Sequence, residues 1–259
     1  MSLPTITIQN HAISRLLVGG NPFSGFSHQS ADMDREMRDY YTTARIKATL
    51  AECEAQGINT FIGRADAHIM RMLREYWNEG GRIQWIAQTA PEHASAEANI
   101  RRAAENGAVG CFIHGGHVER LYQEGHLEQV RELLDCIRQA GMLAGLAAHF
   151  ANLHREVLER GFNPDFHVVC FYNCGSLHAG AGERFDPADP PQAVAVIQQI
   201  PQPCIAYKIL AAGRNAPEEA FRYAYTHIKP TDAVVVGIYT RHHPTQVADD
   251  VALVKRILG

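Results

Sequence analysis

Short apolar runs recur eight times along the chain, and a longer stretch with helical spacing follows each of them. The runs are rich in valine and isoleucine and cover residues 16–21, 60–63, 83–89, 108–114, 143–149, 167–173, 204–210 and 233–239. Runs that are apolar throughout are typical of strands covered on both faces. Strands alternating with helices predict right-handed βαβ units and a parallel sheet. Eight such units predict one α/β domain, residues 1–259, closed into a (β/α)8 TIM barrel, with an open doubly wound sheet as the alternative.

Several stretches between the runs have the spacing of amphipathic helices. Apolar residues recur at helical spacing in residues 127–137, and residues 43–56 and 97–106 also predict helices, each followed by a glycine. Ahead of the first run, residues 5–8 alternate between polar and apolar, and residues 12–16 follow a short polar turn. This pattern predicts a β-hairpin that closes the floor of the barrel.

One long polar connection, residues 22–42, interrupts the alternation. Its aromatic and histidine residues are Phe23, Phe26, His28, Tyr40 and Tyr41. Long loops with aromatic residues in compact domains are often lids. We therefore expect a lid at the barrel mouth, with a disordered surface loop as the alternative.

Composition narrows the class of protein. Hydrophobic residues make up 46% of the 259 residues and charged residues 20%, which suffices for a large core and argues against a disordered or fibrous chain. A formal net charge of −4 argues against a basic nucleic-acid-binding surface. No apolar run approaches the roughly 20 residues of a membrane helix, and no secretory signal is visible. We expect a cytoplasmic protein that acts on a small molecule, without nucleic-acid or membrane partners, and with a homodimer as one option.

The six cysteines are scattered and form no CxxC pair. They are Cys53, Cys111, Cys136, Cys170, Cys174 and Cys204, and most of them fall inside apolar segments. This distribution predicts buried free thiols in a reducing compartment.

The C-terminal ends of the predicted strands carry the candidate chemistry, because barrels of this type place their active sites there. The expected catalytic groups are His68, His114, His149, Asp66 and Lys208. The expected substrate-binding groups are Asn21, Arg64, Tyr172, Asn173 and Tyr207. His114 and His149 end adjacent strands, so their imidazoles are expected about one strand spacing apart, ~4.8 Å.

Two chemistries are open to this set. Asp66, His68, His114 and His149 offer nitrogen and oxygen ligands for a divalent metal such as Zn, Mn, Fe or Ni. In the metal-free alternative, the same side chains are acid–base and substrate-binding groups. Lys208, desolvated inside an apolar strand, predicts a Schiff-base nucleophile or a general base, unless it pairs with a carboxylate.

The ends of the last two strands predict an anion site. Loops after the seventh and eighth strands of such barrels commonly bind phosphate. The residues in question are Gly213, Arg214, Gly237 and Arg241. They are expected to hold a phosphorylated substrate or a nucleotide cofactor, with ordinary turns as the alternative.

Several segments resemble the aldo-keto reductase superfamily, and together they span nearly the whole chain. The matching segments are residues 13–20, 57–61, 112–114, 206–210 and 236–238. The resemblance implies a (β/α)8 barrel with an N-terminal hairpin. It also implies NADPH as a cofactor, with Tyr207 stacked on the nicotinamide ring.

The chain departs from that family at the residues that transfer protons. The family's aspartate, tyrosine and lysine fall on Gly63, His68 and Thr89, and only the histidine, His114, matches. The serine–asparagine pair that holds the nicotinamide carboxamide falls on Ala148 and His149, and the strand-6 glutamine falls near Val169. Losing three proton-transfer residues undermines hydride transfer by the family's mechanism, unless a group such as His68 replaces them.

Three functions follow from these observations. The first is an isomerase, lyase or hydrolase that acts on a small polar carbonyl or sugar-like substrate by histidine–aspartate acid–base or metal-assisted chemistry. The second is a divergent NADPH-dependent reductase. The third is a non-catalytic binding protein on a degenerate barrel.

Overall fold

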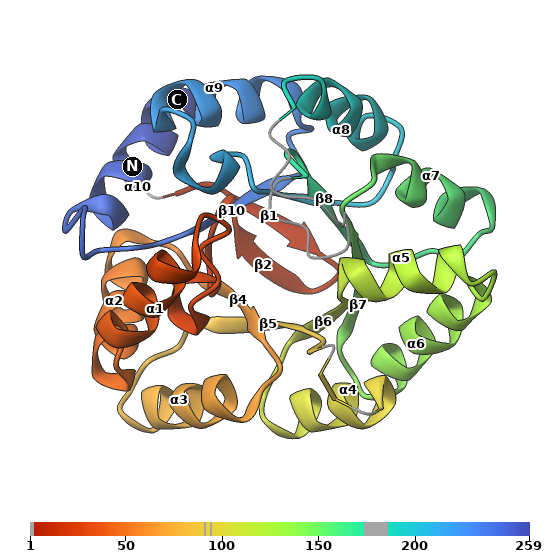
Figure 1. Ribbon diagram of the computed structural model, residues 1–259, viewed down its shortest axis with the longest axis horizontal. Coiled ribbons are helices and arrows are strands. Elements are labelled where there is room, and N and C mark those ends of the chain that lie inside the picture. The colour runs from red at the N-terminus through yellow and green to blue at the C-terminus, as the bar shows by residue number, and fades with distance from the viewer. Residues whose placement is uncertain (1–2, 91, 94, 174–185) are drawn as a thin grey trace.

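Eight parallel strands close into a barrel, as the eight apolar runs predict. The computed structural model describes residues 3–90, 92–93, 95–173 and 186–259 (Figure 1). The strands are β3 (Leu16–Gly19), β4 (Thr60–Arg64), β5 (Gln84–Gln88), β6 (Gly110–Ile113), β7 (Leu143–Ala148), β8 (Phe166–Cys170), β9 (Cys204–Tyr207) and β10 (Ala233–Gly237). They pair in the order β10-β3-β4-β5-β6-β7-β8-β9, and β10 pairs with β3 to close the ring.

Helices surround the barrel. They are α1 (Ala31–Tyr40), α2 (Thr43–Gln56), α3 (Ala67–Asn78), α4 (Ala96–Glu105), α5 (Gly115–Gln123), α6 (Glu128–Gln139), α7 (Ala151–Glu159), α8 (Asp189–Ile197), α9 (Pro217–His227) and α10 (Gln246–Leu258). The predicted helix at residues 43–56 is confirmed, and it ends at Gly57 in the left-handed region (φ 96°). The connection between β6 and β7 holds two helices, and α5 packs against β7 (Figure 1).

Buried side chains form one layer inside the barrel and another between the barrel and the helices, because successive residues of a strand point to opposite faces. Inward residues such as Ile62, Ile86 and Phe112 form one cluster, and their outward neighbours pack under the helices in another. The hairpin β1 (Thr5–Ile8) and β2 (His11–Ser14) adds Ile6, Ile8 and Ile13 to the inward cluster. The predicted plug of the barrel floor is therefore confirmed, and Figure 1 shows the hairpin lying across the ring.

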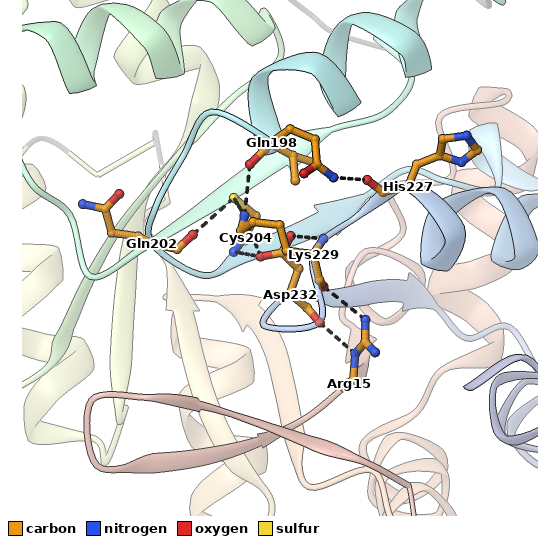
Figure 2. A network of polar contacts seen from close by, with 8 residues as sticks. Arg15, Gln198, Gln202, Cys204, His227, Lys229 and Asp232 are labelled. Atoms are coloured by element: carbon orange, nitrogen blue, oxygen red, sulfur yellow. Dashed lines mark hydrogen bonds and ion pairs between the residues drawn. The ribbon is translucent and has the colours of Figure 1, made fainter. Parts of the chain in front are cut away.

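A buried carboxylate joins the strands at the floor (Figure 2). Asp232 precedes β10 and is fully buried; it accepts hydrogen bonds from the Cys204 amide (2.8 Å) and the Lys229 amide (2.7 Å). The Lys229 ammonium lies 2.9 Å from the same carboxylate, and the Arg15 guanidinium donates to the Asp232 carbonyl (3.0 Å). Burial raises the pKa of Asp232, and the bonds from Lys229 oppose that rise. The network fixes the starts of β9 and β10 relative to β3.

The segment between β3 and α2 is ordered in the structure rather than an irregular loop. It holds a 3-10 turn, η1 (Pro22–Ser24), and helix α1. Ser30 begins α1 by accepting a hydrogen bond from the Met33 amide (3.2 Å). The polar connection 22–42 therefore contains a serine N-cap and the helix that follows it. Within the described residues, no helix is both long enough and apolar enough to cross a membrane.

Two buried histidines face each other between helix α7 and strand β8. The Nδ1 atoms of His154 and His167 lie 3.0 Å apart, and neither residue is exposed to solvent. One ring must donate its Nδ1 proton and the other must accept it, so the accepting ring must be neutral. Burial lowers the pKa of His154 to about 4 and that of His167 well below 6.5.

We predict that this pair makes the fold acid-sensitive. Above about pH 6.5 both rings are neutral in the folded and unfolded states, so the stability that they contribute is fully present. As the pH falls from 6.5 towards 4, the unfolded chain takes up protons that the folded chain excludes, and the free energy of unfolding falls by up to ~1.4 kcal/mol per pH unit for each ring. Urea denaturation at several pH values measures this slope. It should be shallower in the double variant His154→Gln/His167→Gln and unchanged in the exposed control His126→Gln; equal slopes in all three proteins would contradict the prediction.

Candidate active site

Aromatic and imidazole rings from three strands converge at the barrel mouth. His114 follows β6, His149 follows β7 and Tyr207 ends β9, and all three continue the inward-facing positions of their strands. The ring centroids of His114 and His149 lie 6.3 Å apart, and those of His149 and Tyr207 lie 6.1 Å apart. The structure thus brings together three of the residues that the strand ends predict.

A buried carboxylate holds the central ring. Oε1 of Glu119, on α5, accepts hydrogen bonds from the backbone amide of His149 (2.6 Å) and from its Nδ1 (3.0 Å). Glu119 is 2% exposed, and the His149 side chain is 9% exposed. A carboxylate is buried only when it is paired, so this double contact accounts for its position.

Glu119 is the residue that the strand ends did not reveal, because it comes from a helix. The signal was a charge on the apolar face of residues 115–123, between Val118 and Leu121, which are both buried. A charged residue in such a position requires a partner. The carboxylate that contacts an imidazole of the site is therefore Glu119, whereas the expected catalytic group Asp66 caps helix α3.

Gly115 makes the contact between His149 and Glu119 sterically feasible. A Cβ at Gly115 would lie 3.1 Å from Nδ1 of His149 and 3.3 Å from Cα of Ala148. The first turn of α5 therefore packs directly on the imidazole, with Glu119 one turn further along.

His114 and His149 carry the proton of the neutral ring on different nitrogens. Nδ1 of His114 accepts a hydrogen bond from the Gly116 amide (3.1 Å) at the start of α5, and the His114 amide donates to Oγ1 of Thr89 (2.9 Å). An Nδ1 that accepts places the proton of the neutral ring on Nε2. His149 donates through Nδ1 to the carboxylate, so its Nε2 is the acceptor in the neutral ring. The mouth thus holds one imidazole that donates through Nε2 and one that accepts through Nε2.

Lys208 lies beyond the strand rather than inside it. Strand β9 ends at Tyr207, and Lys208 adopts a left-handed conformation (φ 58°), which is uncommon for residues other than glycine. Its Nζ lies 5.7 Å from the ring centroid of Tyr207, so the ammonium lies beside that ring. The expected apolar strand environment of Lys208 is wrong, because β9 is three residues shorter than the run 204–210.

The proposed metal ligands are not assembled. Asp66 caps helix α3 by accepting from the Ile69 amide (2.9 Å), and its other oxygen lies 3.4 Å from Nε of Arg64. His68 is exposed in the first turn of the same helix. Across the described residues, no three His, Cys, Asp or Glu side chains are grouped to hold a metal ion. The predicted set Asp66, His68, His114 and His149 is therefore wrong as a cluster, because helix capping takes Asp66 and the helix carries His68 to the surface.

Three of the expected substrate-binding residues, Arg64, Asn21 and Asn173, are bonded to other residues of the protein. Arg64 pairs with Asp66 and Glu92, and its guanidinium stacks on Phe26. Asn21 bonds to the His28 ring through its amide nitrogen (3.2 Å), and the Asn173 amide donates to Asp189 (2.9 Å).

Tyr172 is half-buried just beyond β8 and packs against the core. Cys174 lies outside the described residues.

The loops after β9 and β10 contact the segment 22–42. Arg214 donates to the carbonyl oxygens of Ala211 (2.9 Å) and His28 (3.3 Å), and Gln29 donates to the Ala212 carbonyl (2.6 Å). Gly213 has a φ of 83° beside the Gln29 amide. The guanidinium of Arg214 therefore fixes the two loops to each other through backbone oxygens.

Arg241 lies in the loop after β10 and faces a carboxylate. Its Nε is 3.8 Å from Oε1 of Glu36 on α1, and this oxygen also accepts from Tyr239 (2.6 Å) and bonds to His242 (2.5 Å). These bonds, with Tyr239 first, lower the pKa of Glu36. Gly237 packs on Pro22, which leaves no room for a Cβ. The described contacts of Arg214 and Arg241 join the loops after β9 and β10 to the segment 22–42. The anion site at Gly213, Arg214, Gly237 and Arg241 stays a prediction.

Comparisons with solved structures agree on the fold. A Pseudomonas aeruginosa protein assigned to the aldo-keto reductases superposes with a TM-score of 0.66 at 16% identity, over 99% of this chain and 94% of that one. A truncated 3-deoxy-D-arabino-heptulosonate 7-phosphate synthase from Thermotoga maritima gives 0.59 at 12% identity, over 99% and 91%. An N-acetylmannosamine-6-phosphate 2-epimerase from Clostridium perfringens gives 0.59 at 12%, over 91% and 92%.

At these identities the likeness confirms the aldo-keto reductase-like barrel as a fold, and nothing more. No family model matches the chain, and no curated protein sequence matches it.

The mouth does not fit a nicotinamide as the resemblance implies. The amide and Nδ1 of His149 are both bonded to Glu119, and its neighbour Ala148 is apolar. Val169 points outward into the layer under the helices, so it cannot face a ring in the mouth. Tyr207 alone has the expected inward position.

We predict that Gly115→Ala disrupts the site. In a helix an alanine is normally more stable than a glycine by up to ~1 kcal/mol. Here the added methyl group lies 3.1 Å from Nδ1 of His149, so the ring or the first turn of α5 must shift by a few tenths of an ångström. We expect a net loss of roughly 1 kcal/mol in urea denaturation and a longer His149–Glu119 contact in a crystal structure. A variant that is more stable than the parent, with the contact intact, would refute the packing described here.

Proposed function

We propose that the barrel mouth carries out general acid–base chemistry next to a carbonyl group of a small polar or sugar-like substrate, as an isomerase or lyase does. The observation that carries the proposal is the Glu119–His149 pair facing His114. Such a pair supplies a positioned base and a positioned hydrogen-bond donor, which proton transfer at a carbon atom requires.

His149 is the base in this proposal. Its Nδ1 proton is committed to Glu119, so its Nε2 lone pair takes a proton from the carbon beside the carbonyl. The buried carboxylate stabilises the imidazolium that forms, because the two opposite charges lie 3.0 Å apart where little water enters.

His114 is the electrophile. Its Nε2–H donates to the carbonyl oxygen and stabilises the negative charge that develops there as the proton leaves. A neutral imidazole at a helix N-terminus has this role in other barrel enzymes. The ring centroids of the two imidazoles lie 6.3 Å apart, so one small substrate can contact both rings.

The rest of the mouth favours a polar substrate of modest size. Tyr207 offers an apolar face with a hydroxyl group, and the Lys208 ammonium beside its ring adds a positive charge. By their names, one of the similar folds forms a phosphorylated sugar acid and another epimerises a phosphorylated sugar, which agrees with this choice by analogy of fold alone.

Exchange of carbon-bound hydrogen tests the proposal. We expect the protein to exchange the C–H next to the carbonyl of at least one compound in a panel of C3–C6 hydroxyaldehydes, hydroxyketones and their phosphates in D2O, followed by ¹H NMR. His149→Gln should reduce the exchange rate about 10²–10⁴-fold, and Glu119→Gln should reduce it less, because the neutral amide still orients the ring. The exposed control His126→Gln should keep the parental rate. No exchange above buffer with the whole panel, or equal rates in all variants, would contradict the proposal.

A reductase is the second candidate, and the inward position of Tyr207 is the observation in its favour. The substitutions at the nicotinamide-contacting positions disagree with it. We expect NADPH to leave the intrinsic fluorescence unchanged up to high micromolar concentrations. Saturable binding that is lost in Tyr207→Ala would instead support the reductase.

A further inference from the structure

The inward side of strand β8 carries a cysteine at the same level as His149. Phe166 and Val168 belong to the cluster inside the barrel, so alternation places Cys170 inward as well. Ala148 and Val169 are paired across β7 and β8, so His149 and Cys170 are the next residues on both strands. On its other side, Cys170 is paired with Tyr207 of β9. The thiol therefore stands between the imidazole and the phenol, about one strand spacing (~4.8 Å) from each strand.

We propose that Cys170 is a reactive thiol of this mouth, activated by His149 and Glu119, and that the site takes an aldehyde as the electrophile. The inference rests on the proposed function, since it uses the same base. A nucleophile, a base on the neighbouring strand and a carboxylate that orients the base are the arrangement that activates a thiol. The Sγ of Cys170 donates to the Tyr172 carbonyl (3.0 Å), which holds the thiol at the upper edge of the strand.

The proposed step is an addition without oxidation or reduction. The S–H bond of Cys170 turns from the Tyr172 carbonyl towards His149, Nε2 of His149 takes the thiol proton, and the sulfur forms a bond to the aldehyde carbon. The π pair of the C=O bond moves onto the oxygen, to which His114 donates a hydrogen bond, and this oxygen takes up the proton that His149 removed. The product is a hemithioacetal; one S–H bond and one C=O π bond have been replaced by one S–C bond and one O–H bond.

Other cysteines of the chain provide internal controls. Cys53, Cys111 and Cys204 are 0% exposed in the outer layer of the core, whereas Cys170 is 5% exposed on the inward side of β8. Burial raises the pKa of all three thiols, that of Cys204 to about 12. Buried thiols of this kind are inert, so they should resist the reagents that reach Cys170.

Alkylation by iodoacetamide from pH 6 to 9, with each cysteine quantified by mass spectrometry, tests the proposal. Tandem fragmentation separates Cys170 from the nearby Cys174. An ordinary thiol with a pKa of ~8.5 is about 3% thiolate at pH 7 and reacts about tenfold more slowly for each unit below that. The titratable groups next to Cys170 are His149, which follows the paired strand β7, and Tyr207, which is paired with it on β9; the Lys208 ammonium lies 5.7 Å from the Tyr207 ring centroid.

We expect the rate at Cys170 to stay nearly level down to pH 6 in the parent protein. In His149→Gln it should fall tenfold per pH unit, so that the two proteins differ at least tenfold at pH 6.5. Glu119→Gln is the milder second variant, and His126→Gln is the control that keeps the parental profile. Carbonyl-¹³C-labelled glyceraldehyde should give a hemithioacetal signal that Cys170→Ala lacks.

The proposal is overturned if Cys170 is as unreactive as Cys111, or if its rate falls tenfold per unit in the parent as in His149→Gln. Labelling requires no turnover, so this failure is separate from that of the proposed function. Normal exchange with an inert Cys170 rejects the thiol alone. A reactive Cys170 without any exchange rejects the proton transfer at carbon alone.

Discussion

The site depends on one buried hydrogen bond, from the imidazole of His149 to the carboxylate of Glu119. A carboxylate that is 2% exposed is costly to bury, and the protein offsets this cost with two donors from one residue, the amide and the ring of His149. Helix α5 presents the carboxylate, and Gly115 lets the helix approach the ring. His114 is the N-cap of the same helix, and its Nδ1 accepts a hydrogen bond from the Gly116 amide. One short helix therefore sets the proton positions of both imidazoles.

The opposite side of the mouth is built from backbone contacts and aromatic residues. The loop after β9 contains four residues with positive φ, namely Lys208, Ala211, Ala212 and Gly213. Three of these are not glycine, and strain of this kind persists only where neighbouring contacts impose it. Here Gln29 and Arg214 supply such contacts between this loop and the segment 22–42. The two sides of the rim thus differ: the β6–β7 side positions protons, and the β9–β10 side is tied to α1.

The sequence predicts the barrel, but it does not predict which side chains contact one another in the site. Eight apolar runs and the alternating hairpin predict the fold because burial on two faces leaves a direct mark on composition. His114, His149 and Tyr207 were found because strand ends of a barrel share one rim. Strand ends do not indicate Glu119, because it lies on helix α5; its mark in the sequence is a charge on an apolar helix face. Asp66 and His68 were wrongly grouped with the imidazoles, because the sequence does not show that a carboxylate after a strand caps the next helix.

The central claim is that the two imidazoles hold their protons on opposite nitrogens. Neutron diffraction from crystals exchanged into D2O at neutral pH locates these protons directly. The account predicts deuterium on Nδ1 of His149, directed at Oε1 of Glu119, and on Nε2 of His114, with none on its Nδ1. Deuterium on Nδ1 of His114, or a His149 ring without deuterium on Nδ1, would contradict it.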